Sequence, residues 1–370
     1  MPGGITIGKI IKSLIPFSED YVPPEVVDRD VEKFELKRFL EPLSEGQMQL
    51  YNMLVTGAVG VGKTLLTKFA CSNLPTNSVY VRLTENDNTF PKFLSKLIAI
   101  MSLPIPISPY FPSNLALMKF EQYINENGKM KNTSLLIVLD DFDKVPIKAV
   151  QPFLHSVPRS TNWCNFLIIS RNPAALEPLP SDTKSTLRCR ELPLKPYDKE
   201  TLFKILKQRA ELALHNPSYV SDELLQKIAE ESTFNGSARE AIEILKTACL
   251  LADRLEADKV EEYHLEEAYE EIERRSLEET IRELPINHKL ILACCRQYPR
   301  TYEEIYKEWC LQLKSRGLKE LSIYRFRDLV ADLKKLDIIR PEIKGQGRGR
   351  GFSYYLILSP HVDPKMIKGG

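Results

Sequence analysis

The sequence predicts an α/β protein: a phosphate-loop domain on a parallel sheet, an all-helical second part and a C-terminal winged helix-turn-helix. Three observations predict this order. A phosphate-loop motif occupies residues 57–64, directly after an apolar run. Apolar strand candidates then alternate with helical patterns, as they do in parallel sheets. Near the end of the chain, helical stretches precede two strand candidates joined by a basic, glycine-rich segment.

The phosphate loop reads Gly57-Ala-Val-Gly-Val-Gly-Lys-Thr64 and follows the apolar run 50–56. Strand, glycine loop and helix in this order form the context in which the motif binds a nucleoside triphosphate. Glycine lets several backbone N–H groups approach a polyphosphate, and the following helix directs its positive end at the same phosphates. We expect Lys63 to contact the β- and γ-phosphates and Thr64 to ligate Mg²⁺. The predicted residues for ATP or ADP here are Val59, Gly60, Val61, Gly62, Lys63, Thr64 and Leu65.

Hydrophobic periodicity predicts the other elements of this domain. The first structured stretch is expected to begin near Tyr21, after a short amphipathic tail that docks on the body or stays mobile. Short apolar runs predict strands, and amphipathic spacing predicts helices. The expected strands are 78–83, 135–141, 165–170 and 187–194, and the expected helices are 31–43, 90–101 and 114–126.

The second and third parts differ in composition from the first. Residues 199–276 read as continuous helix, rich in Leu, Ala, Glu and Lys, without a strand candidate. Further on, helices are followed by a β-hairpin with a basic tip, which describes a winged helix-turn-helix. The expected helices are 278–282, 289–296, 302–312 and 322–336, and the hairpin strands are 338–344 and 352–358 around the tip 345–351.

Acidic residues close the apolar strand 135–141. A carboxylate there can hold the Mg²⁺ that bridges the β- and γ-phosphates, and we assign this role to Asp140. Asp141 stands where a catalytic base or a water-orienting carboxylate is needed. Asn172, two residues after the next strand, is a candidate for orienting the attacking water. A simple turn asparagine is the alternative at that position.

A helix in the second part opens with Asn235-Gly-Ser-Ala-Arg239. A guanidinium gains nothing from the dipole at a helix N-terminus, which makes a solely structural role for Arg239 less attractive. We therefore predict that Arg239 folds over the phosphates and senses whether a γ-phosphate is present.

The motifs occur in a recognisable order: the phosphate loop, Leu-Asp-Asp-Phe-Asp at 139–143, Ile-Ser-Arg-Asn at 169–172, Gly-Ser-Ala-Arg at 236–239 and the winged helix. This order resembles the archaeal replication initiators of the Orc/Cdc type, within the AAA+ ATPases, over residues 21–358. The resemblance implies a nucleotide-binding base at 21–198, a helical lid at 199–278 and a winged helix at 279–370, after an N-terminal tail at 1–20. It also implies that Tyr197 and Arg209 reach the nucleotide.

The chain departs from the family pattern in three places. The residue after the magnesium aspartate is usually Glu, whereas Asp141 is one methylene shorter. The stretch Ser181-Asp-Thr-Lys-Ser-Thr-Leu187 lacks the arginine that usually acts on a neighbour's nucleotide. The polar residue after the third core strand is either Arg171 or Asn172. These departures predict nucleotide binding with weak ATPase activity.

Duplex DNA is the predicted partner of the winged helix. Tyr324, Arg325 and Arg327 lie near the start of the helix that usually meets base edges. Lys344, Arg348 and Arg350 belong to the hairpin and its glycine-rich tip, which can approach a groove or the phosphate backbone. In the base, Lys92 and Lys96 match the position of the family's initiator-specific insertion. The alternatives are a winged helix that binds protein and, for the two lysines, a solvated helix face.

Composition agrees with this assignment and excludes several classes of protein. Net charge is +1, but residues 281–370 carry 18 basic against 10 acidic side chains, while the rest of the chain has a net acidic charge. Opposite charge on two parts of one chain indicates that the C-terminal part meets a polyanion. No apolar run approaches the ~20 residues of a membrane span. The 7 scattered cysteines argue against a disulfide framework and for a reducing cytoplasm, where we expect association with the nucleoid.

The sequence thus predicts an ATP-dependent initiator that binds origin duplex DNA and changes conformation with its nucleotide. Replicative helicase and further copies of the initiator are the other expected partners. Two other interpretations stay open. One is a signalling or defence ATPase whose winged helix is only a connector, and the other is a nucleotide-regulated transcription regulator.

Overall fold

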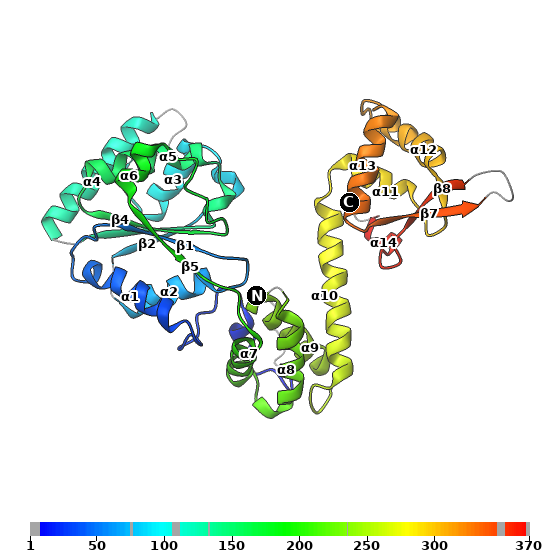
Figure 1. The fold of residues 1–370 in the computed structure, drawn as a ribbon, viewed down its shortest axis with the longest axis horizontal. Coiled ribbons are helices and arrows are strands. Elements are labelled where there is room, and N and C mark those ends of the chain that lie inside the picture. Colours follow the sequence, from blue (N-terminus) through cyan, green and yellow to red (C-terminus); the bar gives the residue numbers. More distant parts are fainter. Residues whose placement is uncertain are drawn as a thin grey trace. The chain divides into compact units, whose positions relative to one another are not determined.

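The computed structural model describes residues 8–74, 77–105, 112–131, 134–234, 236–345 and 352–367. The chain divides into two compact units, the first ending at Leu265 and the second beginning at Glu266. The division falls inside the helix α10 (Glu262–Glu283). Figure 1 shows the helices and strands of both units, labelled where there is room.

A five-stranded parallel sheet forms the centre of the first unit, with the strand order β2-β3-β4-β1-β5. All five strands are expected from the sequence, and their bounds agree with the expected ranges to within a few residues. Parallel pairing places the carboxyl ends of the strands at one edge, where ligands bind in open α/β sheets. The strands are β1 (Asn52–Thr56), β2 (Ser78–Arg82), β3 (Leu135–Asp140), β4 (Cys164–Ser170) and β5 (Cys189–Pro193).

Helices cover both faces of this sheet (Figure 1). On one face lie α1 (Asp30–Ser44) and α2 (Lys63–Asn73), which bury an apolar cluster with β1. On the other face lie α3 (Phe90–Ile100), α4 (Ser113–Lys131), α5 (Ile147–Ser160) and α6 (Ser181–Leu187). Phe153 of α5 is fully buried there, with its ring 5.3 Å from those of Phe93 and Phe120. Neither α5 nor α6 is among the helices predicted above. Single 3₁₀ turns occur at Glu85–Asp87 and Phe142–Lys144.

The stretch after β5 is helical, as expected, but it forms four helices rather than one continuous helix. They are α7 (Lys199–Ala213), α8 (Asp222–Ser232), α9 (Ala238–Arg254) and α10, with a 3₁₀ turn at Pro217–Tyr219. Side chains cap the first three: Asp198, Ser221 and Ser237 each accept a hydrogen bond from a backbone N–H of the following turn. Such caps satisfy donors that a helix leaves unpaired at its start. The polar cap residues therefore explain where the continuous apolar pattern is interrupted.

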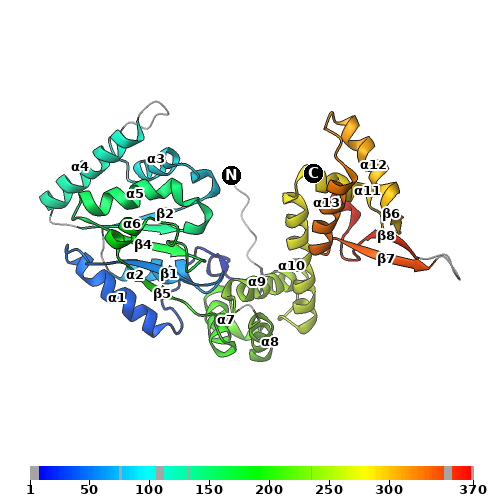
Figure 2. The same cartoon turned by 45° about the horizontal axis from the view of Figure 1, so that its top comes forward.

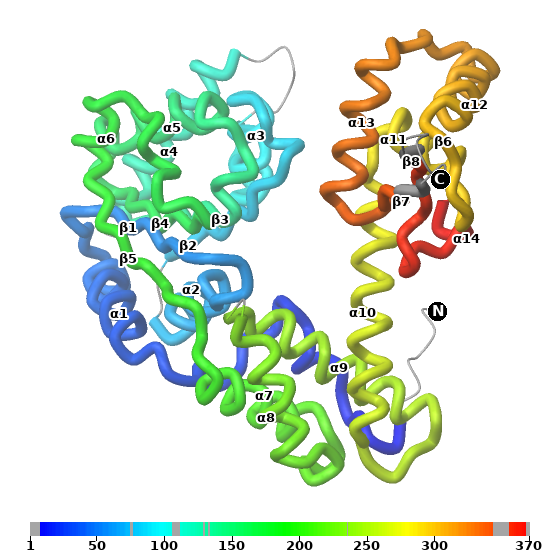
Figure 3. The backbone as a smooth tube through the Cα atoms, turned by 45° about the vertical axis from the view of Figure 1, so that its right-hand side comes forward, coloured from blue at the N-terminus to red at the C-terminus, as the bar shows by residue number. Residues whose placement is uncertain are grey.

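The N-terminal segment is ordered earlier in the chain than the expected start near Tyr21. Ile10 and Ile11 are buried, and their backbone amides donate to the two carboxylate oxygens of Asp253 in α9, at 2.7 and 3.1 Å. The segment continues through the 3₁₀ turn η1 (Ile15–Phe17). Figure 3 shows this blue segment running beside α7 and α9. The short amphipathic tail thus docks on the helical part of the first unit.

The second unit has the helices and the β-hairpin of a winged helix-turn-helix. Its helices α11 (Ile286–Cys294), α12 (Tyr302–Ser315) and α13 (Ile323–Lys335) pack on a three-stranded antiparallel sheet with the order β6-β8-β7 (Figure 2). The strands are β6 (Arg300–Thr301), β7 (Ile339–Gly345) and β8 (Phe352–Leu358), and the short α14 (Pro364–Ile367) follows. Trp309 and Phe326 are fully buried, with ring centroids 5.3 Å apart.

Two details of the expected winged helix were wrong. Residues 278–282 do not form a separate helix, because they are the end of the continuous α10. The amphipathic spacing of the expected helix 322–336 also predicts Leu336 on its apolar core face, but Leu336 is 46% exposed at the end of α13. Within the described residues, no helix has the combination of length and apolar character that crossing a membrane requires.

Candidate nucleotide site and nucleic-acid surface

The phosphate loop connects β1 to α2 at the carboxyl edge of the sheet, as the motif predicts. Gly60 and Gly62 have φ angles of +79° and +86°, a left-handed conformation that residues with a Cβ rarely adopt. A Cβ on Gly62 would also lie 2.5 Å from the hydroxyl of Tyr197. The backbone path around the N-terminus of α2 therefore depends on glycine at both positions.

Lys63 is half-buried and is the first residue of α2. Its ammonium donates hydrogen bonds to the carbonyl oxygens of Gly57 and Ala58, at 2.8 and 2.7 Å. Burial lowers the pKa of Lys63, against the opposing effect of the nearby carboxylates Asp140 and Asp143. The ammonium thus folds back over the loop, where a bound polyphosphate would compensate its charge better than neutral carbonyls do.

Thr64 and Asp140, the two predicted magnesium ligands, are brought together. The Thr64 hydroxyl donates to Asp140 Oδ2 at 2.8 Å, across 76 residues of sequence. Asp140 closes β3 and is only 2% exposed. A second hydroxyl, that of Tyr80 in β2, donates to the same Oδ2 atom. No sequence motif singles out Tyr80. Burial, and then the bond to Asp140, raise the pKa of Tyr80.

Asp141 lies beside the metal position but is held by two cations. Its Oδ2 atom accepts from Arg82 Nε at 3.2 Å and from Lys144 Nζ at 2.9 Å. Burial acts to raise the pKa of Asp141, and the hydrogen bonds from Lys144 and Arg82 outweigh it, so the net shift is downward. The carboxylate is ionised and paired, which opposes a role as proton acceptor in this conformation. Its assignment as a catalytic residue stays a prediction.

Asn172 lies in the turn after β4 and is exposed. Its Oδ1 atom accepts from the backbone N–H of Ala174 at 2.9 Å, the bond of an asparagine that closes a turn. The preceding Arg171 forms an ion pair with Asp143 at 2.6 Å. Both candidates for the polar residue after the third core strand thus have a structural contact. The water-orienting role of Asn172 remains a prediction.

The helical part touches the phosphate loop directly. The backbone N–H of Ala238 donates to the carbonyl of Gly60 at 3.1 Å, and a Cβ on Gly60 would lie 2.1 Å from Ser237 Oγ. This contact brings Arg239, in the first turn of α9, close to the loop. The Arg239 guanidinium forms an ion pair with Glu19 of the N-terminal segment at 3.3 Å. The sequence had not indicated this acidic partner.

Tyr197 is 8% exposed and lies against the phosphate loop through its hydroxyl. The Arg29 guanidinium stacks on its ring, 4.2 Å from the centroid, and donates to the Val61 carbonyl at 3.2 Å. Arg209 is buried and donates to the Pro16 carbonyl at 3.0 Å. Burial lowers the pKa of Arg209, against the opposing effect of Tyr21 and Tyr197. The Arg209 guanidinium lies 5.0 Å from the ring centroid of Tyr21. The contact of Tyr197 and Arg209 with a nucleotide stays a prediction.

The side chains at this edge fit a polyphosphate and a hard divalent cation. A hydroxyl and a carboxylate, from Thr64 and Asp140, are the oxygen ligands that Mg²⁺ prefers. Lys63 provides a positive charge in the loop that wraps the start of α2. In addition, Arg209 Nε and Arg29 Nε are buried without a hydrogen-bond partner among the described residues. Each of these buried N–H groups can still donate a hydrogen bond to a ligand.

In the second unit, the predicted recognition residues lie on the exposed side of α13. Tyr324 is 73% exposed, and Arg325 and Arg327 are also exposed, whereas Phe326 between them is buried. Among the described residues, Arg325 forms a long ion pair with Asp328, at 3.8 Å. An exposed aromatic ring and two exposed guanidinium groups at the start of this helix are suited to a duplex groove.

The other residues predicted to contact DNA differ in how exposed they are and in whether the structure describes them. Lys344 belongs to β7, and Arg348 and Arg350 lie outside the described residues. Lys92 is exposed and donates to Asn88 at 3.3 Å. Lys96 is instead engaged with the buried Asp87, at 2.6 Å, and also donates to the Arg82 carbonyl. Lys96 thus neutralises a carboxylate of its own domain, which reduces its availability to a phosphate.

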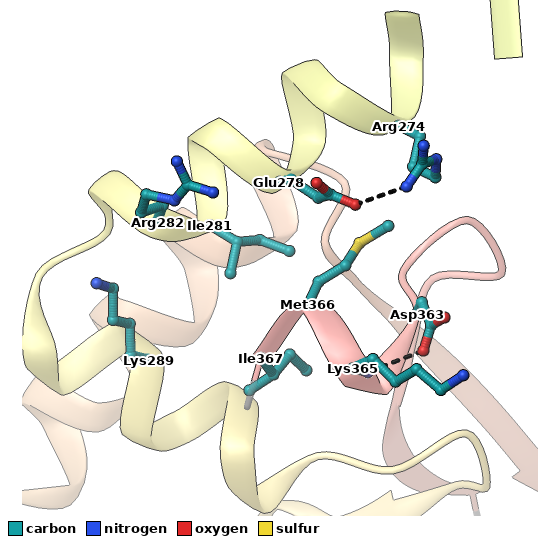
Figure 4. A pocket seen from close by; sticks show the side chains of 9 residues that line it. All are labelled: Arg274, Glu278, Ile281, Arg282, Lys289, Asp363, Lys365, Met366 and Ile367. Carbon is teal, nitrogen blue, oxygen red and sulfur yellow. Dashed lines mark hydrogen bonds and ion pairs between the residues drawn. The ribbon is translucent and has the colours of Figure 1, made fainter. Parts of the chain in front are cut away.

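A hollow of about 360 Å³ lies in the second unit between α10, α11 and α14 (Figure 4). Arg282 and Lys289 project on one side of it, while Ile281, Met366 and Ile367 contribute apolar surface. Arg274, also on its wall, is paired with Glu278 at 3.0 Å. The hollow contains no residue of the phosphate loop, so it is not the nucleotide site.

Comparisons with known proteins agree with this arrangement. Residues 203–270 match the family described as the Cdc6 AAA+ ATPase-type lid domain. The chain is 28% identical, over 347 residues, to the "ORC1-type DNA replication protein 1" of Sulfurisphaera tokodaii, covering 89% of this chain and 85% of the relative. It is 26% identical to the protein of the same name from Sulfolobus acidocaldarius, over 98% of this chain and 94% of the relative.

A solved structure supports the fold of the whole chain. The Aeropyrum pernix ORC1 protein, solved in complex with DNA, matches with a TM-score of 0.73 and 24% identity, over 97% of this chain and 96% of that one. At this level of identity the match establishes the fold, a phosphate-loop base, a helical lid and a winged helix.

Proposed function

We propose, since the chain belongs to the archaeal Orc/Cdc-type family of AAA+ proteins, that it is an ATP-dependent DNA replication initiator. It binds origin duplex DNA through its winged helix and its ATPase domain, and its nucleotide state switches its conformation. One observation carries this proposal: the start of the lid helix α9 rests on the phosphate loop, with Ala238 bonded to Gly60. A change in the conformation of the phosphate loop is therefore expected to move the start of α9 and with it the lid.

ATP or ADP with Mg²⁺ is the proposed ligand of the carboxyl edge of the sheet. Lys63 binds the β- and γ-phosphates, and Thr64 and Asp140 hold the cation, which neutralises charge that develops on the phosphates. Val59, Gly60, Val61, Gly62 and Leu65 line the loop through their backbone. Tyr197 and Arg209 contact the nucleotide from the side of the lid.

We propose that the lid distinguishes ATP from ADP through Arg239. This guanidinium is near the loop and is paired with Glu19, half-exposed on both sides of the ion pair. A γ-phosphate offers more negative charge and bidentate acceptors than a single carboxylate does. We infer that Arg239 exchanges Glu19 for the γ-phosphate when ATP binds, and that this exchange sets the angle between lid and base.

Hydrolysis is proposed to be slow, so that the ATP-bound state persists on DNA. The support is the pairing of Asp141 with Arg82 and Lys144, which keeps the carboxylate from acting as a base. The residue is also one methylene shorter than the usual glutamate. The chain is thus foremost a nucleotide-dependent switch with weak ATPase activity.

Duplex DNA meets the protein through Tyr324, Arg325 and Arg327 of α13 and through the hairpin that carries Lys344, Arg348 and Arg350. Lys92 adds a contact from the base. The functional boundaries that we propose are 21–198 for the base, 199–278 for the lid and 279–370 for the winged helix, with residues 1–20 as a docked tail. Because the proposed initiator acts on origin DNA, we expect it to associate with the nucleoid, with helicase and further initiator copies as partners.

A genome-wide footprint of the bound protein tests this function. An initiator should give a few strong sites that coincide with the start of nascent DNA strands, and the sites should weaken when Lys63 is replaced. Many sites at promoters would favour a transcription regulator. An absence of salt-sensitive affinity for duplex DNA would instead favour a signalling ATPase with a winged-helix connector.

A further inference from the structure

We propose that Tyr80 is a positioning residue for the divalent cation: its hydroxyl holds the Asp140 carboxylate in the orientation that presents it to the metal. The inference rests on the proposed nucleotide function. It concerns a residue of β2, outside both the phosphate loop and the acidic end of β3.

The hydrogen bonds around Asp140 define its orientation. Asp140 Oδ2 accepts from two hydroxyls, those of Thr64 and Tyr80. Asp140 Oδ1 accepts from the backbone N–H of Asp141 at 2.8 Å. A carboxylate has about four lone-pair sites, so three donors leave one, and it lies on Oδ1. The two hydroxyls therefore determine which oxygen of Asp140 is available to a cation.

Tyr80 is itself held in place from two sides. Its ring is half-buried in β2, whose neighbour in the sheet is β3 with Asp140 at its end. The Lys68 ammonium lies 5.2 Å from the ring centroid, and Lys68 forms an ion pair with Asp20 at 3.0 Å. Because Lys68 and Thr64 are both in α2, the same helix fixes the ring and one metal ligand.

Thr64 alone is a less rigid partner for Asp140. When the Thr64 oxygen rotates to ligate a cation, its hydrogen bond to Asp140 Oδ2 is expected to weaken. Tyr80 is not one of the expected metal ligands, so its hydroxyl stays available as a hydrogen-bond donor to Asp140 Oδ2. Partners of this kind, behind the direct ligands, typically change metal affinity 10–100-fold when they are removed. We expect Tyr80 to act in this way.

Tyr80→Phe tests the inference in the full-length chain, because it removes only the hydroxyl and keeps the ring over Lys68. ATP affinity is measured by fluorescence titration across a range of Mg²⁺ concentrations and again in EDTA. The Mg²⁺ concentration that gives half of the metal-dependent gain in affinity should rise by about 10–100-fold. Affinity in EDTA should stay unchanged. Binding of Mn²⁺ to the ADP complex, followed by electron paramagnetic resonance, should weaken by the same factor.

Tyr51→Phe is the matched control, since it deletes the same atom from a half-buried ring that packs 5.7 Å from Phe39. Its Mg²⁺ dependence should equal that of the wild type. A Tyr80→Phe variant with wild-type Mg²⁺ and Mn²⁺ dependence overturns the inference while leaving the proposed function intact. Weaker binding in EDTA as well as in Mg²⁺ overturns it too, because the hydroxyl would then support the loop. A wild type that binds no nucleotide under either condition refutes the proposed function and the inference together.

Discussion

The guanidinium of Arg239, at the start of α9, lies 3.3 Å from the carboxylate of Glu19, in the segment before the base. Glu19 thus occupies the arginine that we expect to meet a γ-phosphate. Half-exposed ion pairs contribute about 0–1 kcal/mol, so the contact is weak enough to exchange for a phosphate. The N-terminal segment therefore bears on the nucleotide response of the lid.

Glu19→Gln should increase the preference for ATP over ADP. The substitution releases Arg239, and removing up to about 1 kcal/mol of competition corresponds to up to about fivefold tighter ATP binding. ADP affinity should not change, because the arginine is assigned to the γ-phosphate. Titration calorimetry with both nucleotides measures the ratio. Glu41→Gln, an exposed position in α1, is the control, and an equal effect there would point to general charge rather than to Arg239.

Lys63→Ala should abolish ATP binding while the fold stays intact. Lys63 is half-buried, yet its bonds to Gly57 and Ala58 hold only the loop, so its removal opens no core cavity. Binding of a fluorescent ATP analogue and the far-ultraviolet circular dichroism spectrum report the two effects. Tight binding by this variant would mean that the loop is not a nucleotide site.

ATP turnover should be slow, well below the ~1–10³ s⁻¹ of typical enzymes. If pairing of Asp141 is a cause, Arg82→Ala and Lys144→Ala together should raise turnover, because the carboxylate then loses both cations. Asp141→Glu should also raise it. Steady-state phosphate release measures these rates, and unchanged rates in all variants would place the limit elsewhere.

Low pH should lower the stability of the nucleotide-binding domain by protonating Asp87. This carboxylate is 7% exposed and is paired with Lys96. Burial acts to raise the pKa of Asp87, but the hydrogen bonds from Lys96 and Thr84 outweigh it, and the pKa is lowered overall. Its contribution to stability is therefore fully present above the unfolded pKa of about 3.9 and is lost as the pH falls through the lower folded value.

Lys96→Ala should accordingly destabilise the protein by about 1–3 kcal/mol at neutral pH, since it leaves a largely buried carboxylate without its cation. Urea unfolding at pH 7 measures this decrease in stability. The difference between the variant and the wild type should shrink as the pH falls below 4. The exposed Lys92→Ala should have little effect, and a comparable decrease there would contradict the ion-pair explanation.

Substitutions in α13 and in the hairpin tip should distinguish contacts to DNA bases from contacts to the phosphate backbone. Arg325→Ala and Arg327→Ala should reduce discrimination between a specific site and random duplex, by ~1–3 kcal/mol for each bidentate hydrogen-bonded pair with a base that the substitution removes. Arg348→Ala with Arg350→Ala should weaken binding to all sequences similarly and lower the salt slope by about one to two units. Mobility-shift titrations at several salt concentrations distinguish the two patterns. Unchanged affinity in all three variants would remove DNA binding from the winged helix.

Local sequence determined much of this protein. The phosphate loop could be predicted because positive φ angles at Gly60 and Gly62 and a following helix are properties of consecutive residues. The strands could be predicted because short apolar runs with polar ends have few alternatives in a parallel sheet. The lid motif and the exposed start of α13 likewise follow from local patterns, a capping serine at 237 and the amphipathic spacing around Phe326.

Only the tertiary structure decided which side chains meet at the edge of the sheet. Tyr80 reaches Asp140, and Arg82 reaches Asp141, because the strand order places β2 beside β3, although some 60 residues separate them in sequence. Glu19 meets Arg239 because the N-terminal segment docks on α9 through Asp253. Hydrogen bonds and ion pairs act over only a few ångströms. Partners of this kind are therefore set by how distant segments pack, which periodicity and motif spacing do not encode.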